Sequence, residues 1–125
     1  MWTYVQASGE LLDDAGKVVG VGYSGKGAAK NDPAQQCFKD NGPLPRGHYT
    51  IHPAVHPPNS LGPLALPLEP DAGNDMCHRS GFYIHGDKIG APGTASDGCI
   101  ILNHDLRKTI DDGTDKRLHV VATHP

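Results

Sequence analysis

Hydrophobic and polar residues alternate over several short stretches of the chain, and such alternation is typical of β-strands. Most stretches are bounded by Gly, Pro, Asn or Asp, which mark turns. Strands are predicted over 2–6, 11–12, 17–23, 46–53, near 64–68, in 80–86 ending at His85, in 98–103 beginning at Cys99, and over 117–123. A turn at 13–16 makes the second and third of these a hairpin, and the rest of 57–75 is predicted to be loop.

Two short segments carry helix signals instead. The segment 104–112 has apolar residues four apart, which share one helix face, and Asn103 is its predicted N-cap. Asp32 followed by a proline is a helix start signal, which predicts a short helical turn over 33–38. The pattern as a whole predicts a mainly β fold with one or two short helices.

Length and composition agree with a small β-rich domain. The chain has 125 residues, so we expect a single domain over 1–125. Its 16 glycines and 11 prolines favour turns and short strands over long helices. The formal net charge is -3 and no block of basic residues occurs, which argues against nucleic acid as a partner.

The chain also lacks the patterns of membrane insertion and of signal-dependent secretion. No apolar run approaches the roughly 20 residues of a membrane-spanning helix. The N-terminus has neither the basic nor the continuous apolar region of a secretory signal. We therefore expect a chain made in the cytoplasm, which stays there or is exported by a route that reads no cleavable leader.

Three cysteines are present, Cys37, Cys77 and Cys99, and an odd number leaves at least one thiol unpaired. One disulfide allows three pairings, of which only Cys37 with Cys77 leaves Cys99 free. No C-x-x-C pair occurs, which argues against a zinc ribbon and against a thioredoxin-type site.

The segment FYIHGDKIGAPGTASDGCI, residues 82–100, places a histidine at one strand end and a cysteine at the next strand start. If these strands are neighbours, the thirteen-residue loop between His85 and Cys99 folds back and brings imidazole and thiol together. The imidazole would then take the thiol proton, because the thiolate is the nucleophilic form. Backbone N–H groups at Gly98 and Cys99 would be available to bind an oxyanion.

This interpretation has a plain alternative and a direct consequence. The alternative is an inert, buried cysteine beside a structural histidine, since free cysteine is among the most buried residue types. The consequence is that a thiol activated by His85 reacts with iodoacetamide faster than a model thiol at about pH 6–7, and that His85→Ala slows it.

The letters HGD…G…SDGCIIL resemble the active-site signature of L,D-transpeptidase catalytic domains, in which a His-Gly pair precedes a Ser/Thr-x-Gly-Cys element. GPLPRGHYTI resembles the P-x-G-x-[FY]-x-I strand of the same family. GYSGKGAAKNDPAQQ and RSGFYIHGDKIGAPGTASDGCI are most similar to a compact subgroup, the L,D-transpeptidase-like toxin effectors of type VI secretion. The resemblance covers residues 4–121.

The resemblance implies a compact L,D-transpeptidase-like β-sandwich or barrel with a cysteine active site, no cofactor and no metal. By position in the motif, Cys99 is the nucleophile and His85 is the general base. In this family a backbone carbonyl often orients the histidine, so no acidic third member is required. The other residues implied are Ser96 and Gly98 in the signature loop, Gly86 and Asp87 after the base, Asp97 in the pocket, and Tyr23 or Lys26 beside the substrate.

The implied substrate is a peptidoglycan stem peptide. The thiolate attacks the carbonyl of the diamino acid at position three and expels D-alanine. Water then completes an L,D-carboxypeptidase reaction, whereas an incoming amine completes exchange or transpeptidation. The same resemblance implies a monomeric antibacterial effector that acts in the periplasm of a target bacterium and has a cognate immunity protein.

Two positions depart from the larger family. Asp97 stands where that family usually has histidine, and Ile101 stands where it usually has arginine or asparagine. These changes remove polar groups that would lie near a substrate carboxylate. Because a guanidinium fork suits a carboxylate, Arg46 and Arg79 are the candidates to bind it.

Eight histidines raise the question of a metal site. Three of them are spaced by four residues: His48, His52 and His56. This run is predicted to be a strand, on which four residues span about 13 Å, too far for two ligands of one zinc ion. Two alternative classes stay open: a zinc amidase or peptidase using His78, His85 and Cys99, and a cell-wall-binding module without catalysis.

Overall fold

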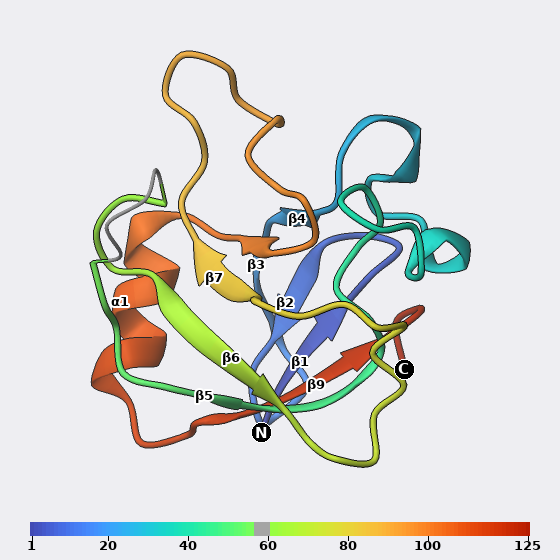
Figure 1. Cartoon of the computed structure of the whole chain (residues 1–125). Helices are drawn as coiled ribbons and strands as arrows, with labels where there is room; N and C mark the ends of the chain where they lie inside the picture. The colour runs from blue at the N-terminus through green and yellow to red at the C-terminus, as the bar shows by residue number, and fades with distance from the viewer. Residues whose placement is uncertain (57–60) are drawn as a thin grey trace.

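The computed structural model describes residues 1–56 and 61–125, and this part of the chain forms one nine-stranded sheet (Figure 1). The strands are β1 (Trp2–Val5), β2 (Glu10–Leu12), β3 (Val18–Val21), β4 (Tyr23–Ser24), β5 (Gly47–Ile51), β6 (Leu66–Pro70), β7 (Tyr83–His85), β8 (Ile100–Ile101) and β9 (Arg117–Val121). One α-helix, α1 (His104–Asp112), and two 3-10 helices, η1 (Gly27–Ala29) and η2 (Pro33–Gln35), complete the described elements.

The sheet nearly closes on itself. Its strand order is β3-β2-β1-β9-β5-β6-β7-β8-β4, so the two edge strands, β3 and β4, follow one another in the chain. Only Gly22 separates them, and its N–H donates to Gly9 O at 2.7 Å. A Cβ atom on Gly22 would lie 1.8 Å from Ile101 O of β8, so the closure requires a residue without a side chain. The result is a barrel-like sheet.

One apolar cluster fills this sheet and extends under the helix. Alternate residues of the strands face it, as in β9, where Leu118 and Val120 are buried and their neighbours are not. The helix adds Ile110, which is buried, and Leu106, which packs against the cluster. Other members of the cluster include Tyr4, Tyr49, Ile51, Leu66, Ile84 and Ile100.

The predicted fold class is confirmed: the described chain is mainly β, with one α-helix. The helix begins and ends as predicted, because Asn103 Oδ1 accepts from Leu106 N at 2.9 Å and Gly113 follows its last residue. The second predicted helix, expected over 33–38, is shorter: it is the 3-10 turn Pro33–Gln35, capped by Asp32. These signals were readable because caps act within one turn of the chain.

Three predicted strands differ from the structure. The single strand expected over 17–23 is broken at Gly22, and its two halves belong to opposite edges of the sheet. The strand expected near 64–68 is Leu66–Pro70, and residues 57–60 of the loop predicted before it lie outside the described residues. The strand expected to begin at Cys99 begins one residue later, at Ile100.

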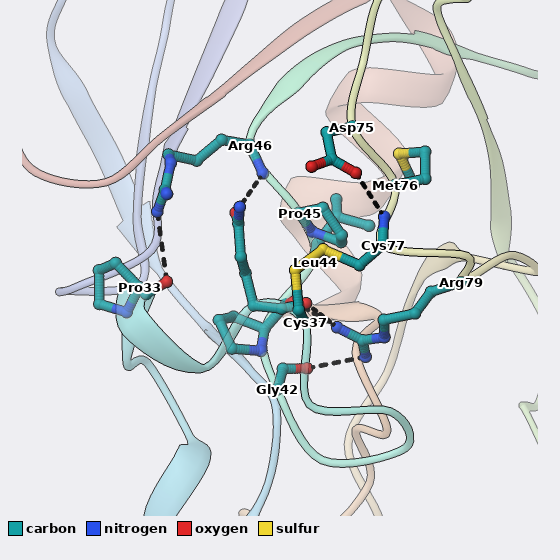
Figure 2. The surroundings of a disulfide bond; sticks show 12 residues. Pro33, Cys37, Gly42, Leu44, Pro45, Arg46, Asp75, Met76, Cys77 and Arg79 are labelled. Carbon is teal, nitrogen blue, oxygen red and sulfur yellow. Dashed lines mark hydrogen bonds between the residues drawn. A yellow bond between two sulfur atoms is a disulfide. The ribbon is translucent and has the colours of Figure 1, made fainter.

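Of the three possible pairings, the structure has the one that leaves Cys99 free. Cys37 and Cys77 form a disulfide, and Cys99 is a free thiol (Figure 2). Of the described helices, none has the length and apolar character needed to cross a membrane.

Candidate active site

The candidate site lies where β7 and β8 run side by side. The two strands are parallel, with Ile84 opposite Ile100 and His85 opposite Ile101. A parallel pair needs a crossover of about a dozen residues, which the loop 86–98 supplies. In Figure 1 this loop, drawn in orange, rises well clear of the sheet before it returns to β8. The prediction that these two strands are neighbours is therefore confirmed.

A pocket of about 400 Å³ opens beside this strand pair, and both His85 and Cys99 line it. His85 is only 3% exposed, and Cys99 is half-buried at the wall. The remaining lining residues are Lys39, Asp40, Leu61, His78, Arg79, Ser80, Gly81, Phe82, Tyr83, Ala95 and Asp97. The imidazole and the thiol thus share one cavity that is open to a ligand.

The imidazole of His85 is oriented by its own chain. Nδ1 lies 2.8 Å from Gly86 O, and a carbonyl oxygen can only accept, so the ring proton is on Nδ1. Nε2 therefore keeps a lone pair that can take a proton. Burial lowers the pKa of His85 below its usual value, and the positive charge of Arg107 adds to this effect. The ring is neutral at pH 7.

The thiol of Cys99 is neutral as well. Burial raises the pKa of Cys99 to about 11, although the Tyr83 N–H, which donates to Sγ at 3.3 Å, opposes this shift. No hydrogen bond joins the His85 ring to Sγ among the described residues, and catalytic contacts of this kind often tighten only with substrate. The pocket therefore holds a neutral thiol and a neutral imidazole.

Ser96 holds the backbone on which the thiol sits. Its buried hydroxyl donates to Cys99 O at 2.5 Å and accepts from Gly25 N at 2.8 Å and from Gly98 N at 3.1 Å. The Gly98 N–H, expected to bind an oxyanion, is therefore already engaged. The Cys99 N–H has no hydrogen-bond partner within the described part of the chain and is the donor that stays available.

The surroundings of position 98 require a glycine. Its φ of +140° is a conformation that glycine adopts readily, and a Cβ there would lie 2.5 Å from Arg79 Nη2 and 2.6 Å from Phe82 Cε1. Its carbonyl accepts from Ser24 Oγ at 2.9 Å. The sequence analysis missed Ser24, because a serine in a Gly-rich segment carries no signal of its own.

Tyr23 and Asp87 brace the loop instead of lining the pocket. The Tyr23 hydroxyl donates to Asp87 Oδ1 at 2.7 Å and accepts from Ala95 N at 3.0 Å, and Asp87 also accepts from Gly93 N. These bonds tie β4 to both arms of the loop 86–98. Substrate contact by Tyr23, and an effect of Asp87 on the ring, stay predictions. Gly86 faces Arg107, whose Nη2 would lie 2.8 Å from an added Cβ.

The two candidate arginines lie in different places. Arg46 lines a separate groove with His48 and His119, away from the pocket. Arg79 does line the pocket, but it is only 7% exposed and donates to four backbone carbonyls, those of Gln36, Gly42, Pro43 and Asp97. The pocket-lining Asp97 carboxylate pairs with Lys26 Nζ at 2.9 Å.

Metal-ligating side chains do not gather in the described structure. Over residues 1–56 and 61–125, no three His, Cys, Asp or Glu side chains are placed to hold one ion. His78, His85 and Cys99 line one pocket, but they do not form such a group. His48 is instead stacked on His119, its partner across the β5–β9 pair, with ring centroids 4.1 Å apart.

Comparison with known proteins supports the resemblance in the motif. No curated protein matches this chain in sequence. The model of one protein family, described as the Tlde1 domain, matches residues 19–124. The match runs from β3 to beyond β9 and includes the base, the loop and the cysteine described above. The chain therefore belongs to the Tlde1 domain family of type VI secretion L,D-transpeptidase effectors.

Proposed function

We propose that this chain is a cysteine L,D-carboxypeptidase and L,D-transpeptidase that acts on peptidoglycan stem peptides. The observation that carries the proposal is the parallel pairing of β7 with β8, which puts His85 and Cys99 in one pocket with Nε2 free. Membership of the Tlde1 domain family supports peptidoglycan as the substrate.

In the first half-reaction, Cys99 Sγ attacks the carbonyl carbon of the third stem residue while His85 Nε2 takes the thiol proton. The Nδ1–H bond to Gly86 O stabilises the imidazolium that forms. The available N–H of Cys99 itself, the residue that carries the attacking sulfur, is the donor proposed to bind the developing oxyanion. The imidazolium then gives its proton to the D-alanine nitrogen, the peptide bond breaks, and a thioester remains on Cys99.

In the second half-reaction, the same imidazole takes a proton from an incoming nucleophile. Water attacks the thioester and gives the shortened tripeptide stem, whereas an amine gives an exchanged or cross-linked product. Cys99 recovers its proton from His85 in both cases. Either outcome removes stem tetrapeptides that the cell wall uses, which accounts for toxicity.

The biological setting is part of the proposal, and membership of an effector family motivates it. The protein is made in the cytoplasm of the attacking cell and works in the periplasm of its target. A cognate immunity protein protects the producer, and the family makes such a partner the expected one.

The decisive experiment is mass spectrometry of muropeptides and of a purified stem tetrapeptide after incubation with the protein. The wild type should release D-alanine, and Cys99→Ala should release none while keeping its circular dichroism spectrum. We expect His85→Ala to lose at least about a hundredfold in rate, because general-base catalysis contributes on the order of 10²–10⁴. His52→Ala is the matched control, since His52 pairs with Glu69 on the surface, outside the pocket.

The other function classes give different results in the same assay. A cell-wall-binding module would bind the tetrapeptide without turnover, and Cys99→Ala would not change that binding. A zinc peptidase would lose activity to a chelator and keep it after thiol alkylation. Tetrapeptide turnover by Cys99→Ala at the wild-type rate would contradict the proposal.

A further inference from the structure

The buried guanidinium of Arg79 connects two parts of the chain that lie far apart in sequence. Nη1 donates to Gln36 O at 2.5 Å and to Pro43 O at 2.9 Å, while Nη2 donates to Gly42 O at 3.0 Å and to Asp97 O at 2.8 Å. Three of these acceptors belong to the segment after η2, and the fourth belongs to the loop that carries the nucleophile. Figure 2 shows the guanidinium reaching toward this segment from the loop that follows Cys77.

The fourth acceptor is next to the nucleophile. The Asp97 carbonyl is part of the peptide unit that leads into Gly98, and Gly98 packs directly on the guanidinium, with no room for a Cβ. Arg79 also lies over the Phe82 ring, 5.2 Å from its centroid. The turn that presents Cys99 therefore rests on Arg79, and a shift of the guanidinium would move that turn.

The disulfide holds both sides of this connection. Cys77 precedes Arg79 by two residues, and Cys37 follows Gln36 directly, so the bridge joins the segment of the donor to the segment that holds three of its four acceptors (Figure 2). Cys77 and His78 have φ values of +56° and +57°, in the left-handed region. Non-glycine residues keep such conformations only where their surroundings impose them. The disulfide is one such constraint, and without it we expect the backbone before Arg79 to relax.

We propose that Arg79 is a positioning residue for the Cys99 turn, and that the Cys37–Cys77 disulfide keeps it in place, so that oxidation of these two thiols completes the active site. The proposal rests on the proposed function. The thiols of Cys37 and Cys77 transfer two protons and two electrons to a disulfide-containing oxidant, which becomes a dithiol. Cys99 stays reduced. Because cytoplasm is reducing and periplasm is oxidising, the enzyme would reach full activity only after delivery.

The test compares four forms of the full chain: the oxidised wild type, the wild type reduced with a phosphine, Cys37→Ser/Cys77→Ser, and Arg79→Lys. Lysine keeps the charge but lacks the planar fork that reaches several carbonyls at once. We expect each change to lower kcat for the stem tetrapeptide by about tenfold to a hundredfold with little change in KM, because misplacement of a catalytic group acts on the chemical step. Near-ultraviolet circular dichroism checks that each form is folded.

A second readout separates positioning from general destabilisation. Once the turn loosens, Cys99 loses part of its burial, so its alkylation by iodoacetamide at pH 7 should become several-fold faster while peptide turnover falls. Arg117→Lys is the matched control: Arg117 donates to Thr50 Oγ1 and to the Asp71 carboxylate, but makes no contact with the Cys99 turn. This variant should match the wild type in both readouts.

The outcomes distinguish this inference from the proposed function. If the oxidised wild type does not turn over any stem peptide, the proposed function fails, and Cys99 alkylation alone then decides the positioning role. Unchanged kcat and unchanged alkylation in the reduced protein and in Arg79→Lys would overturn the inference. If the reduced and Ser-substituted forms do not fold, Arg79→Lys with its disulfide intact decides it.

Discussion

The catalytic histidine and cysteine of the proposed mechanism are both shielded from water, and this shielding sets their protonation. Burial disfavours the charged form of each group, which lowers the pKa of His85 and raises that of Cys99 to about 11. A resting thiolate–imidazolium pair is therefore not expected. The sequence motif predicts fast alkylation of Cys99, whereas its burial in the structure favours slow alkylation.

The pH dependence of activity follows from the same shifts. Acid protonates His85 and removes the base, and since its pKa lies below 6.5, kcat/KM should fall only below that pH, with its midpoint under 6.5. On the alkaline side the rate should stay level from about pH 7 to 9, because the thiol is still protonated there. At pH 7, Cys99 should react with iodoacetamide more slowly than a small free thiol. A midpoint at or above 6.5 would contradict the lowered pKa of His85, and faster alkylation would indicate a preformed thiolate–imidazolium pair.

Single residues also show how far a motif can be read. The motif indicated Ser96 and Gly98, and in the structure both hold the Cys99 turn from within four residues of it. Arg79 was expected to bind a substrate carboxylate, but its donors are occupied by backbone carbonyls of distant segments. Residue type identifies a guanidinium, whereas only the folded chain shows what surrounds it.

At the scale of elements, local signals were readable and long-range ones were not. The helix His104–Asp112 was predicted to the residue because its N-cap, apolar face and terminal glycine all act within the segment. The break between β3 and β4 was missed because its cause lies in the other strands. Gly22 packs tightly between Gly9 and the β8 backbone.

This closure gives an element-scale prediction. Gly22→Ala would put a methyl group on Ile101 O, so β3, β4 or β8 must shift. We expect a loss of about 1–3 kcal/mol in the free energy of unfolding, measured by urea denaturation, from overpacking alone. Gly73→Ala is the control, because nothing lies within 4 Å of a Cβ at that position. Equal stability of the two variants would show that the sheet edges do not meet as described.

At the scale of the whole molecule, the disulfide ties two long segments that carry little regular structure. Its cysteines are 40 residues apart in sequence, and the segment from η2 to β5 has no strand among the described residues. Counting cysteines showed that one would be free, but not which one, because three pairings satisfy the same count. Only the spatial approach of Cys37 to Cys77 selects among them.

Loss of this bridge should lower global stability as well as activity. Cys37→Ser/Cys77→Ser is expected to unfold with about 2–4 kcal/mol less free energy than the oxidised wild type, since the unfolded chain loses a loop constraint. For a domain of this size the melting temperature should drop by on the order of 10 °C, measured by calorimetry. Reductant should not lower the melting temperature of the double variant further. An unchanged melting temperature on reduction of the wild type would contradict the prediction.

The parallel pairing of β7 with β8 has a consequence for how such proteins diversify. The spacing between His85 and Cys99 is set by hydrogen bonds across two neighbouring strands and does not depend on the length of chain that links them. Between Lys88 and Pro92 the link is exposed, so residues can be inserted or deleted there without displacing either chemical group. The loop therefore tolerates changes of length between these residues, while His85 and Cys99 keep their places beside the β7–β8 pair.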